Sequence, residues 1–85
     1  MVKVENKPTA LSLRKGQTAI VESIKSNEFT SRLLSLGILP GKECKIVGFA
    51  PFGGGGILAL EKHLIAMREE ELSSVFVTFE ISSGK

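Results

Sequence analysis

Cysteine and histidine are the side chains best suited to bind a transition metal or to act in catalysis, and this chain has one of each, Cys44 and His63. Neither stands in a CxxC or HxxxH pair, and no cluster of carboxylates accompanies them. A structural zinc site takes four ligands, and a nucleophile needs a base beside it. We therefore expect no enzymatic activity and no resident cofactor. Cys44 and His63 stay only as candidate ligands for a transiently bound Fe(II) or other divalent metal.

The pattern around each of these two residues favours a structural interpretation. Cys44 alternates with Ile46 on one face of a predicted strand, so its thiol is expected to be buried as a small apolar group. His63 falls in a predicted tight turn between two strands, where its ring is expected to be solvated. The acidic run 69–71 is interpreted as the solvated surface of another turn.

Four consecutive glycines, Gly53–Gly56, suggest a phosphate-binding loop. A P-loop continues with Lys and then Ser or Thr and opens a helix. Here Ile57 and Leu58 follow the glycines and begin an apolar strand. We interpret the segment as a flexible loop between strands. Phe52 just before it either folds back on the domain or contacts a partner.

Length and charge further limit the kinds of protein that this chain can be. The chain has 85 residues, which is enough for one domain. Its formal net charge is +2, and the two signs are interspersed. A nucleic-acid-binding domain of this size usually shows a basic stripe beside aromatic residues, so we expect no nucleic-acid partner. No apolar run approaches the ~20 residues of a membrane helix, and a single cysteine fits a reducing compartment. We expect a cytoplasmic protein, a monomer or weak homo-oligomer, that meets a membrane only through a partner.

One helix is predicted over residues 26–36. Ser26 or Asn27 is placed to cap it, and its apolar residues recur with helical spacing on a single stripe, namely Phe29, Leu33 and Leu36. Gly37 stands where a helix end takes left-handed geometry. Pro40-Gly41 then favours a tight turn. Arg32, Leu34 and Leu39 are left outside both the stripe and the turn.

The rest of the chain reads as β-structure, with one helical turn over residues 68–72. Strands are predicted over residues 18–24, 43–50, 57–60, 64–67 and 75–81. Broken alternation in the first strand predicts either two covered faces or a bulge. Five strands in so short a chain predict a mainly β fold, a small barrel that curls until it nearly closes. The domain is expected over 9–81, between a flexible N-terminal tail, 1–8, and a C-terminal tail, 82–85.

The order of these features resembles the FeoA family, the small cytosolic partners of the bacterial ferrous iron transporter FeoB. The residues that carry the resemblance are Leu11-x-Leu13-x-x-Gly16, Arg32-Leu33-Leu34-x-Leu36-Gly37-Ile38-x-Pro40-Gly41, Ala50-Pro51-Phe52-Gly53 and Ile65-Ala66-Met67-Arg68-x-Glu70. The chain departs from the family where Gly54–Gly56 replace an Asp-Pro that often follows the Pro-x-Gly loop. The resemblance implies an SH3-like five-stranded barrel and a non-enzymatic accessory role in Fe(II) uptake, through binding of the cytoplasmic part of a FeoB-type membrane GTPase.

Arg32, Leu34, Leu39 and Phe52 are the residues we expect to contact that partner. Two other roles stay open from the sequence. One is a stand-alone metal-responsive domain, because FeoA-like domains also resemble the C-terminal barrel of iron-dependent repressors. The other is an RNA-binding SH3-like module, which the weak positive charge disfavours.

Overall fold

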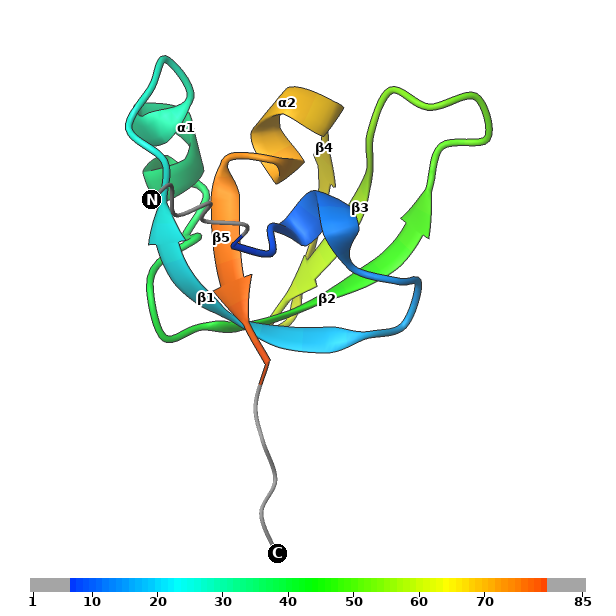
Figure 1. Cartoon of the computed structure of the whole chain (residues 1–85), viewed down its shortest axis with the longest axis horizontal. Coiled ribbons are helices and arrows are strands. Elements are labelled where there is room, and N and C mark those ends of the chain that lie inside the picture. Colours follow the sequence, from blue (N-terminus) through cyan, green and yellow to red (C-terminus); the bar gives the residue numbers. More distant parts are fainter. Residues whose placement is uncertain (1–6, 80–85) are drawn as a thin grey trace, which may run out of the picture.

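Five antiparallel strands form one curled sheet in the order β4-β3-β2-β1-β5, in a computed structural model that describes residues 7–79 (Figure 1). Three short helices complete the structure. Along the chain the elements are η1 (Ala10–Ser12), β1 (Thr18–Ile24), α1 (Thr30–Ser35), β2 (Glu43–Phe49), β3 (Gly56–Leu60), β4 (His63–Met67), α2 (Glu69–Leu72) and β5 (Val75–Thr78). The predicted mainly β architecture with one helix after the first strand and one helical turn before the last is confirmed.

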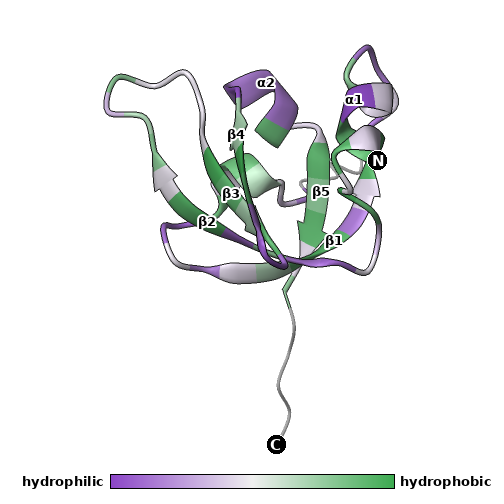
Figure 2. Ribbon diagram, turned by 180° about the vertical axis from the view of Figure 1, so that it is seen from behind, coloured by the Kyte–Doolittle hydropathy of each residue, from purple (hydrophilic) through white to green (hydrophobic). Residues whose placement is uncertain are grey.

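The inner face of the sheet covers a single core. Figure 2 shows apolar residues along β3 and β5 and a hydrophilic α2 whose last residue is apolar. In β2 the predicted alternation holds, since Cys44 and Ile46 are buried while Lys45 and Val47 are exposed. The largest fully buried side chains come from both α1 and α2 as well as the sheet: Leu33, Ile38, Ile46, Leu58, Leu72, Val21, Val75, Val77 and Cys44.

Two irregularities bend the sheet. The register between β1 and β5 shifts between Val21 and Ser23, which is the bulge that the broken alternation predicted. A second shift, between Ile46 and Gly48, lies in the pairing of β2 with β3. The bends curl the sheet but do not close it, because β4 and β5 stand at opposite ends of the strand order. The predicted curled sheet of five strands is therefore confirmed, although it stays open and keeps two edges.

The segment before η1 pairs with the β5 edge of the sheet. Along β5, the carbonyl of Pro8 accepts a hydrogen bond from the Val77 N–H at 3.0 Å, and Thr9 forms a bridge with Phe76. Pro8, the last residue of the predicted tail 1–8, is thus bonded to the sheet, and residues 1–6 of that tail lie outside the described part of the chain. β5 itself ends at Thr78, earlier than the predicted 81, and the tail predicted over 82–85 lies outside the described residues.

Helix α1 is shorter than the predicted 26–36 because a turn precedes it. Asn27 caps this turn: its Oδ1 accepts a hydrogen bond from the Phe29 N–H at 2.8 Å, and its own N–H donates to Thr30 Oγ1 at 2.8 Å. The predicted stripe does face the core. Leu33 is fully buried, and Phe29 and Leu36 pack against the core.

The end of α1 follows the predicted geometry. Gly37 has φ +90°, its N–H donates to the Leu34 carbonyl at 3.0 Å, and the Ile38 N–H donates to the Leu33 carbonyl at 3.1 Å. These two bonds define a Schellman cap, which places Ile38 in the core. The Pro40-Gly41 turn then closes through the Lys42 N–H and the Leu39 carbonyl at 3.1 Å.

Neighbouring leucines in α1 give the first test of this packing. Leu33→Ala removes a fully buried side chain and should lower the free energy of unfolding by about 2–5 kcal/mol. Leu34→Ala, at a position 44% exposed in the same helix, should change it by about 0.5 kcal/mol or less. Urea denaturation followed by circular dichroism measures both. Equal effects would contradict the burial pattern of α1.

Candidate protein-binding surfaces

Arg32 connects α1 to α2. Its Nε donates to Glu71 Oε2 at 2.6 Å, while Glu71 Oε1 accepts the backbone N–H of Arg68 at 2.9 Å. Glu71 is 4% exposed, although its neighbours Glu69 and Glu70 are exposed. The interpretation of 69–71 as a wholly solvated surface is therefore wrong for Glu71. Arg32, expected to be free of structural duties, has one.

The surroundings of Glu71 hold it as a carboxylate. Burial of the carboxyl group raises its pKa. The hydrogen bonds from the Arg68 N–H and from Arg32, with the positive charges of both arginines, outweigh burial, and the net pKa is lowered. A second connection joins the same two segments: Asn27 Nδ2 donates to Ser74 Oγ at 2.9 Å, and the Lys25 N–H donates to the Ser74 carbonyl at 2.8 Å. The beginning of α1 is thus held against the segment after α2.

The predicted partner-binding residues fall on two separate surfaces. Leu34 and Leu39 are 44% and 41% exposed and lie in and just after α1, close in sequence to Arg32. Phe52 lies in the loop between β2 and β3. Figure 1 shows this loop and α1 at opposite sides of the molecule, with α2 between them. One flat contact therefore does not include both Leu34 and Phe52.

The loop that carries Phe52 is bonded to itself rather than free. The Ala50 N–H donates to the Gly55 carbonyl at 2.9 Å, and the Gly53 N–H donates to the Ala50 carbonyl at 3.3 Å. Gly55 has φ +135°, and a Cβ there would lie 2.0 Å from the Met67 carbonyl oxygen. Only glycine fits so close to the end of β4. Phe52 does not fold back on the domain, since it is 99% exposed.

An apolar hollow of about 370 Å³ lies beside this loop. The sequence did not predict this hollow, because it depends on how β3 pairs with β4 and on how closely the loop approaches β4. Ile57 pairs with Ala66 and Ala59 with Leu64, so all four share the face opposite to buried Leu58. The hollow is lined by Val47, Gly48, Phe49, Ala50, Gly54, Gly55, Gly56, Ile57, Ala66 and Met67.

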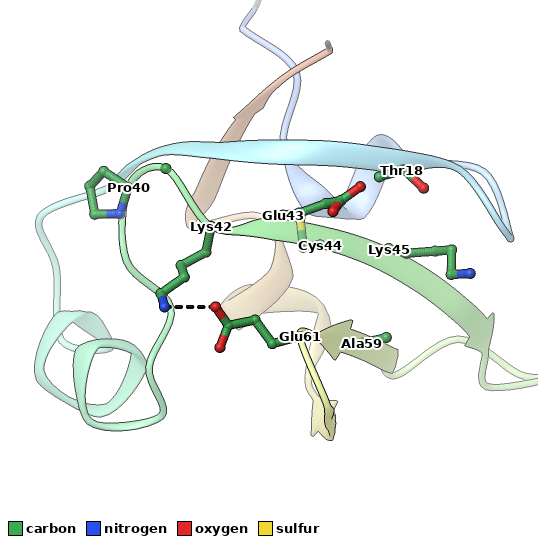
Figure 3. Close-up of a pocket in the computed structure, with 9 residues that line it drawn as sticks. Thr18, Pro40, Lys42, Glu43, Cys44, Lys45, Ala59 and Glu61 are labelled. Atoms are coloured by element: carbon green, nitrogen blue, oxygen red, sulfur yellow. Dashed lines mark hydrogen bonds and ion pairs between the residues drawn. The ribbon is translucent and has the colours of Figure 1, made fainter.

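A second depression, a groove of about 600 Å³, lies between the turn after α1 and the β3–β4 turn (Figure 3). Lys42 Nζ donates to Glu61 Oε2 at 2.7 Å across it, and this hydrogen bond lowers the pKa of Glu61. The positive charge of Lys42 is therefore paired with the carboxylate of Glu61. Cys44 contributes to the wall, but its side chain is 1% exposed.

The two candidate metal ligands are not brought into a ligand cluster. Within residues 7–79, no three His, Cys, Asp or Glu side chains gather in a way that could hold a metal ion. Burial, with the nearby charge of Glu43, raises the pKa of Cys44 to about 11. His63 is exposed but pairs with Leu60 as the first residue of β4, so the predicted turn 61–63 is one residue too long.

Within residues 7–79, no helix has the length and apolar content needed to cross a membrane.

The curled five-stranded sheet with small capping helices defines the class as an SH3-like domain, and comparisons with known proteins specify the family. The model of the FeoA domain matches residues 9–78, so the chain belongs to the FeoA family, which is associated with ferrous iron transport. No curated protein matches the chain significantly. The resemblance seen in the sequence is therefore confirmed at the level of family and fold.

Solved structures of FeoA proteins have the same fold. FeoA from Chlorobium tepidum is 26% identical, with a TM-score of 0.79 over 91% of this chain and 74% of that one. FeoA from Stenotrophomonas maltophilia, crystallised with zinc and described as a prokaryotic SH3-domain protein, is 27% identical, with a TM-score of 0.73 over 82% of this chain and 88% of that one. A manganese-dependent transcriptional repressor has a TM-score of 0.79 at 16% identity, over 93% of this chain and 45% of that one. This last likeness shows the fold alone.

The connection through Glu71 predicts a pH-dependent stability. In the folded protein the pKa of Glu71 lies below its ordinary value of 4.5. The ionised carboxylate therefore stabilises the fold fully above pH 4.5, and this stabilisation is lost as the pH falls through the folded pKa. Glu71→Gln should lower the free energy of unfolding at pH 7 by about 1.5–3 kcal/mol and flatten its decline in acid. The matched control is Glu70→Gln, on the exposed side of the same turn. Urea denaturation from pH 7 down to acid compares them; a Glu71→Gln profile parallel to that of the wild type would contradict the role of the carboxylate.

Cys44 is predicted to be slow to react. With a pKa of about 11, about one thiol in a thousand is ionised at pH 8, and the folded chain covers it. Alkylation by iodoacetamide should be at least about 100-fold slower in the folded protein than in the same protein unfolded in urea. Mass spectrometry measures the modified fraction with time. Rapid alkylation of the folded chain would show that Cys44 is accessible.

Proposed function

We propose that this protein is a non-enzymatic accessory subunit of a bacterial ferrous iron uptake system and binds the cytoplasmic part of a FeoB-type membrane GTPase. The observation that carries the proposal is membership of the FeoA family over residues 9–78. The Stenotrophomonas relative is described as a candidate activating factor for ferrous iron transport, which supports an accessory role here. In this proposal the protein works in the cytoplasm and reaches the membrane only through its partner.

The contact surface that we propose is the outer side of α1 with the segment after it. Leu34 and Leu39 are exposed apolar side chains, and Arg32 lies in the same helix with its side chain 59% exposed despite its bond to Glu71. An exposed apolar pair beside an arginine has the composition that is enriched in protein interfaces. The Schellman cap at Gly37 and the connection of Arg32 to Glu71 hold this surface in place.

Binding to the transporter's cytoplasmic domain tests the proposal. The wild-type chain should bind it, and Leu34→Asp should weaken binding about 10-fold or more, because a charge would then enter a desolvated contact. Phe52→Asp is the matched variant, since Phe52 is also exposed but lies on the other side of the molecule. It should leave binding within about threefold of the wild type. Pull-down and biolayer interferometry with purified proteins give the dissociation constants.

Circular dichroism of each variant separates loss of contact from loss of fold. A folded wild-type chain that does not bind the transporter would contradict the proposed function. Unchanged binding of a folded Leu34→Asp variant would contradict the α1 surface alone. Loss of binding in Phe52→Asp but not in Leu34→Asp would move the transporter contact to the β2–β3 loop.

A further inference from the structure

The β2–β3 loop and the sheet face beside it form an exposed apolar region that the α1 surface does not use. Phe52 is 99% exposed, Leu64 69%, Phe49 43% and Val47 40%. All four come from β2, β4 and the loop between β2 and β3. An exposed patch of this kind on a small domain commonly marks an interaction site. The patch consists of a projecting group, Phe52, and a receiving group, the apolar hollow.

The hollow suits an aromatic ring. Its volume is about 370 Å³, whereas a cavity of about 150 Å³ already holds a benzene ring. Every residue that lines it is apolar or glycine. Ala50, Gly54 and Gly55 of its wall belong to the loop that carries Phe52, so exposed Phe52 is flanked in sequence by residues of the wall.

Backbone hydrogen bonds hold the turn that carries Phe52. Phe52 occupies the turn closed by the Gly53 N–H and the Ala50 carbonyl, and the base of the loop is closed by the Ala50 N–H and the Gly55 carbonyl. Gly55 lies against the backbone of Met67, which is itself part of the wall. The ring is therefore presented to solvent by a bonded turn, and exposing it costs burial that only an intermolecular contact restores.

From this arrangement we propose that a second copy of this chain docks on the hollow, with Phe52 of each copy inserted into the hollow of the other. A two-fold interface needs the projecting and the receiving group on the same patch, and this patch has both. A two-fold interface also brings identical residues of the two copies near its axis, so like charges at its centre would repel one another. None of the residues that line the hollow carries a charge, and exposed Lys45 of β2, which pairs with Ala59 on the same face, is not among them.

The dimer is weak and leaves α1 free. We propose a transient complex, of the kind that small interfaces form. Because the loop and α1 lie at opposite sides of the molecule, Leu34 and Leu39 stay exposed in the dimer. Self-association through Phe52 is thus separate from the proposed contact with the transporter.

Sedimentation velocity of the full chain over a wide concentration range measures the association. The wild type should shift from monomer to dimer as concentration rises. Phe52→Asp should weaken association about 30-fold or more, as expected for a central aromatic residue. Leu34→Asp, the control from the α1 surface, should dimerise like the wild type. Phe52→Leu keeps an apolar projecting group and should retain part of the association, which separates docking from an unfolded loop.

Isotope-filtered NMR on a mixture of labelled and unlabelled chains tests the geometry itself. Contacts are expected between the Phe52 ring of one copy and the methyl groups of Val47, Ile57 and Ala66 of the other. A wild-type chain that stays monomeric at the highest concentration would overturn the proposal, as would a dimer that survives Phe52→Asp or lacks these contacts. Transporter binding by monomeric Phe52→Asp reports on the proposed function independently of either result.

Discussion

The buried carboxylate of Glu71 is the interaction on which the arrangement of the helices depends. It receives the Arg68 N–H from its own helical turn and the Arg32 guanidinium from α1, two segments far apart in the chain. Removing either donor would leave a buried charge short of partners, which costs more than the net gain of the bond itself. The carboxylate therefore adds directional bonds to the position of α1, beside the bonds of the preceding turn to Ser74 and the apolar contacts of Leu33.

Local features of the fold could be predicted from the sequence because their causes are local. The stripe of Phe29, Leu33 and Leu36, the glycine that ends α1 and the alternation in β2 each depend on residues a few positions apart. What could not be predicted depends on pairing between distant segments. The burial of Glu71 requires that Arg32 arrive from another element, and the open edge of β4 depends on how far the bulged sheet curls.

The candidate surfaces follow the same division. Leu34 and Phe52 could be selected from the sequence, since one lies off the apolar stripe and the other in a glycine-rich loop, and both are exposed. Their distribution over opposite sides of the molecule could not, because it depends on the topology of the whole sheet. The apolar hollow also could not be predicted from the sequence. It is created by the register of β3 against β4 and by Gly55 lying against Met67, and neither contact leaves a pattern in the sequence.

The separation of the two candidate surfaces has a consequence for a domain of so few residues. A domain this small buries a modest core, so each exposed apolar group lowers its solubility without adding to its stability. Leu34 and Leu39 on one side and Phe52 on the other are therefore exposed apolar groups that the proposed contacts would cover. The loop and α1 lie at opposite sides of the molecule, so a contact at one does not cover the other. In the proposed complexes, two weak contacts would each raise the effective concentration for the other, so the domain would gain affinity for an assembled transporter without enlarging either interface.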